Sequence, residues 1–318
     1  MTEVSQVDLL QNSDDELITG YLHDCELRRL SPATIEGYRS NLNIVSSFLR
    51  RKGLSIHKLD KDSLRNLLGF LVAQGYVCNT LLQYFAALSG FSDYLVWEGI
   101  IQTNSVIPFR KRYLKQYKNQ HDPERKLISV EEMASLINSI LNPRDKAIVT
   151  LLAKTGIRRG ELIRIDADDI DWVEQSIRLK PHPKRSNCTI FFDDETARVL
   201  RRWMKSRQNY HIEKDCKALF INERGGRLRR HGVYHAVKKY AQRLGLHNPE
   251  SKNMEDHFTP HCCRHWFTTN LRRNGMRREF IKELRGDARN DAVDIYDHID
   301  KRELKRAYLA AIPVLGLG

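Results

Sequence analysis

Long hydrophobic runs are missing from this sequence of 318 residues. A helix that crosses a bilayer needs about 20 consecutive apolar residues, and no run approaches that length. The first residues, MTEVSQVDLLQNSDDE, are polar and acidic, so they lack the basic and apolar regions of a secretory signal. We therefore expect a cytoplasmic protein with no membrane partner.

Cysteine is sparse, and its six positions form no Cys-x-x-Cys pair and no disulfide framework. A reducing compartment is the default for such a chain. One segment does gather residues that bind zinc elsewhere, but their spacing matches no standard ligand set, and adjacent cysteines on a helix point apart. We predict no metal and no cofactor. The residues of this alternative zinc site are His257, His261, Cys262, Cys263 and His265.

Acidic residues are in deficit, because 53 Lys and Arg stand against 40 Asp and Glu, a net charge of +13. The excess is uneven along the chain. Residues 1–117 hold 13 basic and 12 acidic side chains, whereas residues 118–318 hold 40 and 28. A basic half indicates a polyanionic partner, and nucleic acid is the common one. The alternative is a surface whose charge only favours solubility.

The first hundred residues have helical patterns alone. An acidic start at Ser13, a Ser-Pro start at Ser31 and apolar residues at helical spacing predict an all-helical domain over residues 13–105. Residues 106–126 are polar, basic and poorly periodic. They predict a linker whose cations can meet phosphates, with a solvated charge run as the alternative. A helical bundle without a role in DNA binding is a second reading of residues 13–105.

The sequence pattern of residues 127–318 predicts a second domain, which combines helices with a short sheet. Ser129 and Glu132 form the pattern of a capping box at its first helix. Runs rich in β-branched and aromatic residues at 176–179 and 188–192 predict two strands, joined by a loop with two prolines. Helical patterns dominate the remainder. The predicted fold class is therefore mainly α with a small β-sheet, or α+β.

Three residues near the end of the chain suit chemistry on a phosphodiester. His261 and Arg264 share one face of a helix because they are three residues apart. Tyr296 follows 32 residues after Arg264, on a separate element. An arginine holds phosphate oxygens in its planar fork, a histidine accepts a proton, and a tyrosine hydroxyl can act as a nucleophile. Tyr308 is the rival nucleophile, although its place on the apolar stripe of the last helix favours core packing.

These residues resemble the second catalytic motif and nucleophile of the tyrosine recombinase (phage-integrase-type) family, whose pattern is His-x-x-Arg, then Gly-His, then Tyr. The run Thr-Gly-Ile-Arg-Arg-Gly-Glu-Leu is similar to the family's first motif and puts Arg158 at its first arginine. Gly286 matches the family, but Asp287 stands where the family has His or Trp. An ionised Asp repels phosphate unless it turns to Arg264 or carries a proton, and it could also mark a slower enzyme. The string around Asp287 is similar to integrase variants of archaeal mobile elements.

The resemblance implies metal-free cleavage of a phosphodiester, with a role for each matched residue. Arg158 and Arg264 stabilise the pentacoordinate phosphorus, and His261 accepts the proton of the nucleophile Tyr296. The product is a 3′-phosphotyrosyl link with a free 5′-hydroxyl. This link keeps the energy of the broken bond, so that rejoining needs no ATP.

A lysine in the loop of a β-hairpin acts as the general acid in that family. Lys184 is the best match for it, Lys180 is the alternative, and a surface lysine without a catalytic role is the third possibility. The catalytic set predicted from the sequence is Arg158, Lys184, His261, Arg264, Asp287 and Tyr296.

The resemblance also implies partners. Residues 13–105 are similar to the family's core-binding, SAM-like domain, so the two domains are expected to form a C-shaped clamp around double-stranded DNA. A homotetramer on two recombination sites is implied, with a monomer or weak dimer off DNA. The helix over residues 303–312 docks on a neighbouring protomer or on its own domain. Two other functions stay open: DNA relaxation of the topoisomerase IB kind, and DNA binding without catalysis.

Overall fold

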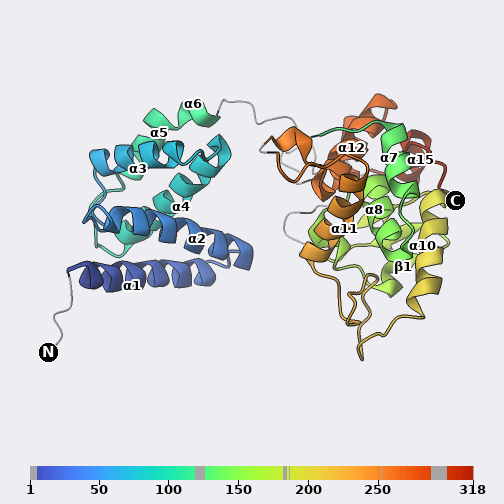
Figure 1. Ribbon diagram of the computed structural model, residues 1–318, viewed down its shortest axis with the longest axis horizontal. Coiled ribbons are helices and arrows are strands. Elements are labelled where there is room, and N and C mark those ends of the chain that lie inside the picture. Colours follow the sequence, from blue (N-terminus) through green and yellow to red (C-terminus); the bar gives the residue numbers. More distant parts are fainter. Residues whose placement is uncertain are drawn as a thin grey trace. The chain divides into compact units, whose positions relative to one another are not determined.

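The computed structural model describes residues 6–118, 126–181, 185, 187–251, 253–287 and 299–317. The chain divides into two compact units, residues 1–122 and residues 123–318 (Figure 1). Each unit has its own hydrophobic core. Within the described part of the chain, no helix is long and apolar enough to span a bilayer.

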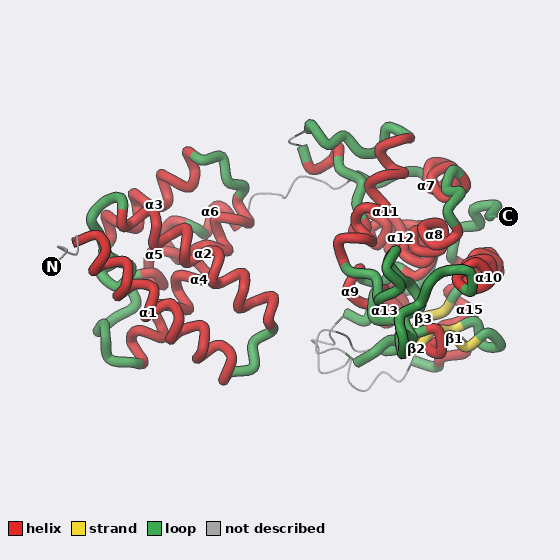
Figure 2. The backbone as a smooth tube through the Cα atoms, turned by 60° about the horizontal axis from the view of Figure 1, so that its bottom comes forward, coloured by secondary structure: helices red, strands yellow, loops and turns green. Residues whose placement is uncertain are grey.

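The described residues of the first unit lie in helices or in the segments that connect them (Figure 2). Ser31 caps its second helix, because the Ser31 side chain accepts the N–H of Thr34 and Pro32 occupies the first turn, where no N–H partner is needed. Helix α4 contacts all the other helices of this unit. The helices are α1 (Gln6–Leu27), α2 (Pro32–Arg50), α3 (Lys61–Ala73), α4 (Cys78–Trp97), α5 (Val106–Tyr113) and α6 (Lys115–Lys118).

The first part of the stretch predicted as a linker, residues 106–126, is helical. Helices α5 and α6 occupy the first part of that stretch and pack against α4. Phe109 stacks on both Phe85 and Tyr113, with ring centroids 5.4 and 4.5 Å apart. Helices this short gain their stability from tertiary packing rather than from their own periodicity. The sequence pattern therefore missed them.

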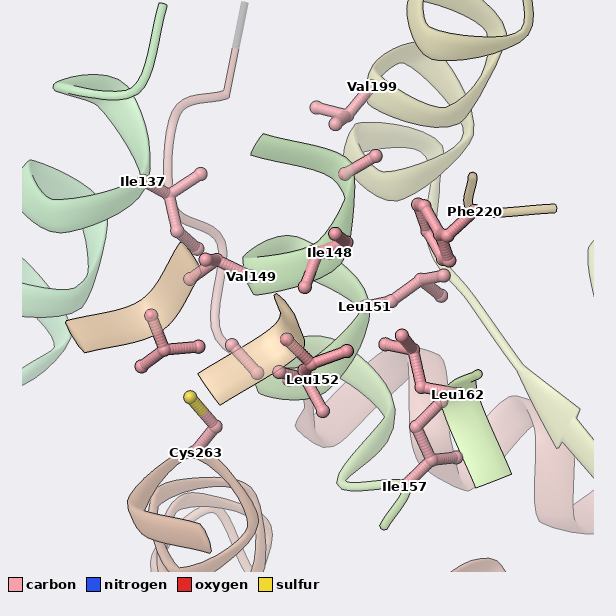
Figure 3. Close-up of a cluster of buried hydrophobic side chains, with 14 of the residues drawn as sticks. Ile137, Ile148, Val149, Leu151, Leu152, Ile157, Leu162, Val199, Phe220 and Cys263 are labelled. Atoms are coloured by element: carbon pink, nitrogen blue, oxygen red, sulfur yellow. The ribbon is translucent and has the colours of Figure 1, made fainter. Parts of the chain in front are cut away.

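Helix α8 (Pro143–Thr155) is the centre of the second unit and contacts α7, α10, α11 and α12 (Figure 1). Asn142 caps it by accepting the N–H of Asp145, and Gly156 ends it in the left-handed conformation. Its buried face forms the core with residues of the surrounding elements (Figure 3). That face includes Ile148, Val149, Leu151 and Leu152.

Local capping signals again match the observed helix starts. The Ser129 hydroxyl accepts the N–H of Glu132 at 3.0 Å, and the Glu132 carboxylate accepts the N–H of Ser129 at 2.8 Å. The capping box is thus confirmed. The other helical elements are α7 (Val130–Asn138), α9 (Arg159–Leu162), α10 (Asp194–Arg207), α11 (Arg230–Arg243), α12 (Pro260–Arg273), α13 (Arg278–Arg285), α15 (Lys301–Ala311) and the 3₁₀ turns η1 (Ala167–Asp169) and η2 (Met254–Asp256).

One antiparallel sheet with strand order β1-β2-β3 lies in the described part of this unit. Ile177 of the middle strand pairs with Ile170 on one side and Ile190 on the other. The two predicted strands are confirmed, while β1 was not predicted. A mainly helical fold with a small sheet is confirmed as well. The strands are β1 (Ile170–Asp171), β2 (Ser176–Arg178) and β3 (Thr189–Phe191).

Helix α15 packs on its own unit, beside the sheet (Figure 2). Leu304 and Tyr308 are buried in one cluster with Phe267 and Leu271 of α12. Of the two positions expected for this helix, the structure therefore has the one on its own domain.

A buried ion pair holds the residues that follow α15. The Lys154 ammonium is fully buried and lies 2.6 Å from carboxylate oxygens of both Asp193 and Glu195. Glu195 in turn accepts the N–H groups of Leu315 and Leu317, each at 2.9 Å. The chain end is thereby fixed to α8 and α10 through charged hydrogen bonds.

Candidate active site

Arg158 follows the sharp end of α8. Gly156 has a φ of +60°, and a Cβ atom there would lie 2.3 Å from the Phe267 ring, so this turn requires glycine. The next helix, α9, begins at once, and the backbone N–H of Arg158 donates to Oε2 of Glu161 at 2.7 Å. Nη1 of Arg158 donates to Oε1 of the same carboxylate at 3.1 Å. Glu161 therefore holds both the backbone and the guanidinium of Arg158.

Arg264 projects from α12 into the interior and is only 5% exposed. Its Nη1 donates to the backbone carbonyl of Gly156 at 2.6 Å, and its Nη2 donates to the carbonyl of Arg285 at 3.0 Å. Because both acceptors are backbone atoms of tight helix ends, they fix the plane of the guanidinium. The turn at Gly156, after α8, and the C-terminal end of α13 therefore fix the position of Arg264 together.

The Asp287 carboxylate lies between these two arginines. Its Oδ1 accepts a hydrogen bond from Nη2 of Arg264 at 2.9 Å and from Nη2 of Arg158 at 3.2 Å. Its Oδ2 forms an ion pair with Nε of Arg285 at 3.0 Å. Two arginines that lie 106 positions apart in the sequence therefore converge on one anionic oxygen. Of the possibilities considered for Asp287, the structure has the turn toward Arg264.

Burial and neighbouring charges govern the protonation of this cluster. Burial lowers the pKa of Arg264 to about 10, and the cations of Arg158 and Arg285 act in the same direction, while Asp287 and Glu161 oppose them. Burial alone would raise the pKa of the Glu161 carboxyl. The Arg185 cation and the Arg158 N–H outweigh it, so that the Glu161 pKa is lowered. Both carboxylates thus compensate buried cations.

His261 and the two arginines line one pocket of about 380 Å³. His261 is exposed on the first turn of α12, and its ring makes an edge contact with His265, the centroids being 4.7 Å apart. Arg230 and Tyr234, on the first turns of α11, line the same pocket. In the sequence Arg230 is one cation of a basic helical pattern, which does not mark it as a pocket residue. Tyr234 was not predicted, since a tyrosine within a basic helical pattern gives no signal for a site.

Arg185 is a further residue of the cluster that the sequence did not reveal. Its side chain is fully buried, and its Nη1 donates to Oε1 of Glu161 at 3.1 Å. Its Nη2 donates to the carbonyl of Leu284 at 3.0 Å. Gly286, with a φ of +60°, leaves room for it, because a Cβ there would lie 2.5 Å from Cγ of Arg185. In the sequence this arginine looks like one more cation of a surface loop.

Two residues of the predicted catalytic set, Lys184 and Tyr296, lie outside the described residues. The alternative lysine, Lys180, is bound elsewhere: its Nζ lies 3.0 Å from an oxygen of Asp166 and 2.8 Å from one of Asp169. Hydrogen bonds to Asp169 and Asp166 raise the pKa of Lys180. A raised pKa makes an ammonium a weaker acid, which disfavours Lys180 as a proton donor.

Tyr308 is a core residue, as its apolar stripe predicted. It is 1% exposed, and its hydroxyl donates to the carbonyl of Lys154 at 2.9 Å. Burial raises its pKa well above the ordinary value for tyrosine. A phenol that is buried, bonded and harder to ionise is poorly suited to attack a phosphodiester.

The residues of the alternative zinc site have other partners. Cys262 and Cys263 are buried, and burial raises the pKa of the Cys263 thiol. Nε2 of His257 lies 2.8 Å from the carbonyl of Ser251. Among the described residues, no group of three or more His, Cys, Asp and Glu side chains is arranged to hold a metal ion.

The chain matches known families over both units. Residues 126–303 match the Phage integrase family, and residues 18–99 match the Phage integrase N-terminal SAM-like domain. The first match includes Arg158, His261 and Arg264.

Similar proteins match over most of their length. Tyrosine recombinase XerC of Herpetosiphon aurantiacus is 31% identical over 282 residues, which cover 86% of this chain and 86% of that protein. Tyrosine recombinase XerD of Listeria monocytogenes is 28% identical over 310 residues, which cover 92% of this chain and 97% of that protein.

Solved structures share the fold. The Tn1549 transposon integrase in complex with transposon right end DNA has a TM-score of 0.68 and 16% identity, and the match covers 92% of this chain and 98% of that one. The XerH site-specific recombinase bound to palindromic difH substrate, in a post-cleavage complex, has a TM-score of 0.67 and 19% identity, with 88% and 80% covered.

Proposed function

The chain belongs to the phage integrase family of tyrosine recombinases, and we propose that it is a site-specific DNA recombinase. In this proposal it cuts and rejoins double-stranded DNA through a 3′-phosphotyrosyl intermediate, without metal or ATP. The observation that carries the proposal is the arrangement of Arg158 and Arg264, which converge on one anionic oxygen and line one pocket together with His261.

The arginines are suited to hold a phosphodiester in that pocket. Their guanidinium groups are held by Glu161 and by backbone carbonyls, so that little reorganisation is needed when negative charge develops on the phosphoryl oxygens. Low exposure of Arg264 strengthens its electrostatic interaction with a bound anion. These features favour stabilisation of a pentacoordinate transition state.

The proton transfers are assigned to side chains of the predicted catalytic set. His261 accepts the phenolic proton as the oxygen of Tyr296 forms its bond to phosphorus. The bond from phosphorus to the 5′ oxygen then breaks, and Lys184 delivers a proton to that oxygen. Reversal of the same steps, with the 5′-hydroxyl of another strand as nucleophile, rejoins the DNA and frees the tyrosine.

Basic residues next to the pocket support DNA as the partner. Helix α11 begins at the pocket with Arg230 and continues with Lys238 and Lys239. Such cations bind the phosphate backbone independently of sequence. We also propose that residues 13–105 and 127–318 act as the core-binding and catalytic domains of a clamp. A homotetramer on two sites would perform the strand exchange in the cytoplasm.

Cleavage at discrete sites tests the proposal. The protein is incubated in EDTA with fragmented genomic DNA of its source organism, covalent complexes are trapped by denaturation, and the attached DNA is sequenced. We expect a few discrete sites with wild type and none with Tyr296→Phe. Relaxation of any supercoiled plasmid without site dependence would favour the topoisomerase alternative. Salt-sensitive DNA binding without covalent complexes would favour the non-catalytic alternative.

A further inference from the structure

Asp287 lies where three guanidinium groups meet, those of Arg158, Arg264 and Arg285. We infer that the Asp287 carboxylate is an internal anion that occupies the phosphate-binding position of the DNA-free protein, and that a DNA phosphate must displace it before cleavage. The inference rests on the proposed function for the identity of the phosphate. It goes beyond that function by identifying a contact that inhibits the site from within.

The arginines do not depend on Asp287 for their orientation. Arg264 keeps hydrogen bonds to the carbonyls of Gly156 and Arg285, and Arg158 keeps its bonds to Glu161. A purely positioning role for Asp287 would repeat contacts that already exist. What Asp287 adds to the cluster is a negative charge at the point where the two guanidinium groups converge.

Asp287 and a phosphate compete for the same donors. An Nη2 group carries two N–H bonds. In Arg264 one of them meets the carbonyl of Arg285 and the other meets Oδ1 of Asp287. Nη2 of Arg264 therefore has no further N–H to offer a phosphate oxygen while Asp287 is bound. A phosphate that approached without displacing the carboxylate would also meet like-charge repulsion.

Arg285 offers a partner for the displaced carboxylate. Its Nε already lies 3.0 Å from Oδ2 of Asp287, and its side chain is 33% exposed. Nε of Arg285 is itself buried and has no hydrogen-bond partner among the described residues, so it can hold Oδ2 of Asp287 while the carboxylate turns and frees the shared Oδ1 contacts. Displacement then costs only part of the interactions of Asp287. The contact thus weakens phosphate binding without preventing it.

Binding of inorganic phosphate to the full-length protein tests the inference without any DNA. Affinity is measured by calorimetry at constant ionic strength, since screening changes surface electrostatics. We expect Asp287→Asn to bind phosphate about tenfold tighter than wild type, a difference of about 1.4 kcal/mol. Asp287→His, which introduces a residue typical of the family, should gain affinity too. Glu303→Gln is the matched control, because Glu303 is an exposed carboxylate paired with one arginine, Arg277.

Several results would overturn the inference. Equal phosphate affinity in wild type and both Asp287 variants would show that the carboxylate does not compete. An equal gain with Glu303→Gln would reduce the effect to net charge. Loss of folding in both Asp287 variants, seen by circular dichroism, would show that the fold requires this carboxylate. That result would contradict the inference, in which the other hydrogen bonds of the arginines are sufficient to orient them.

Covalent complex formation separates this inference from the proposed function. With DNA in excess, Asp287→Asn should form the covalent complex about tenfold faster than wild type, because displacement of the carboxylate adds to the barrier. If the Asp287 variants bind phosphate more tightly but no variant forms a covalent complex, the proposed recombinase activity is refuted, whereas the inference that Asp287 competes with phosphate is supported. Covalent complexes with unchanged phosphate affinity would instead support the recombinase and refute the internal anion.

Discussion

Oε1 of Glu161 accepts a hydrogen bond from Nη1 of Arg185 at 3.1 Å, the same oxygen that Arg158 contacts. One buried carboxylate thus joins the first motif arginine to the strand-connecting segment around Arg185. Through the bond from Arg185 to the carbonyl of Leu284, the link continues to the end of α13. Glu161 and Arg185 together therefore link three segments that are distant in the sequence.

Replacement of Glu161 by Gln should destabilise the second unit. The change leaves the fully buried Arg185 without its anionic partner, and breaking a buried pair in this way costs about 3–5 kcal/mol. The free energy of unfolding is measured in urea by the fluorescence of buried Trp203 and Trp266. Glu303→Gln, at an exposed pair, should cost less than about 1 kcal/mol. Equal losses in the two variants would show that burial of the pair does not matter.

Replacement of Gly156 by Ala should disturb Arg264 as well as the backbone. Alanine at a left-handed position costs about 1 kcal/mol or more. Here the new Cβ would also lie 2.3 Å from the Phe267 ring, so the turn must shift its carbonyl, which binds Arg264. Gly245→Ala is the control, because Gly245 also has a positive φ but nothing lies within 4 Å of its Cβ position.

We expect Gly156→Ala to lose more stability than Gly245→Ala and to slow covalent complex formation at least about tenfold. Gly245→Ala should leave that rate near the wild-type value. Thermal unfolding and single-turnover cleavage measure the two effects. Identical behaviour of both variants would contradict the tight approach of Gly156 to Phe267.

Stability should fall as the solution becomes acidic. In the folded chain the Arg185 cation and Lys154 outweigh burial and lower the pKa of Glu161 and Glu195 respectively. Stabilisation from such groups is complete above the unfolded value of about 4.3 and is lost as pH falls through the folded pKa. Urea unfolding at a series of pH values below about 5 measures the slope. Glu161→Gln should reduce the slope of the unfolding free energy against pH. An unchanged slope would show that Glu161 does not contribute to the loss of stability in acid.

Replacement of Lys154 by Met should loosen the chain end. Glu195 would remain buried without its cation, at a cost of about 3–5 kcal/mol. The double variant with Glu195→Gln should recover part of that loss, because no unpaired charge of Glu195 is left. Hydrogen exchange should accelerate at the N–H groups of Leu315 and Leu317, which Glu195 accepts. Unchanged exchange there would show that other contacts hold the end.

Local signals explain why much of the fold could be predicted from the sequence. The cap at Ser31 and the capping box at Ser129 each act within a few residues, and both are present. Helices α5 and α6 could not be predicted, because they depend on distant contacts such as that of Phe109 with Phe85. The position of α15 also depended on packing that no local pattern specifies.

In the candidate site, too, local motifs could be predicted from the sequence, whereas contacts between distant segments could not. Arg158 and Arg264 could be predicted as a pair because their motifs are short and ordered, and the structure brings them to one oxygen. Arg185 and Arg285 were missed, since a sequence shows that a residue is charged but not which way its side chain turns. The contact of Asp287 with both motif arginines was only one of several possibilities, because its geometry depends on the end of α13.

Mapping the covalent bond tests the central claim most directly. DNA carrying a cleavage site is incubated with the protein in EDTA, the trapped complex is digested, and the peptide that carries the nucleotide is sequenced by mass spectrometry. We predict a phosphodiester on Tyr296, lost in Tyr296→Phe and strongly reduced when Arg158 or Arg264 is replaced by Gln. A covalent bond on Tyr308, or cleavage that requires a metal ion, would contradict the account.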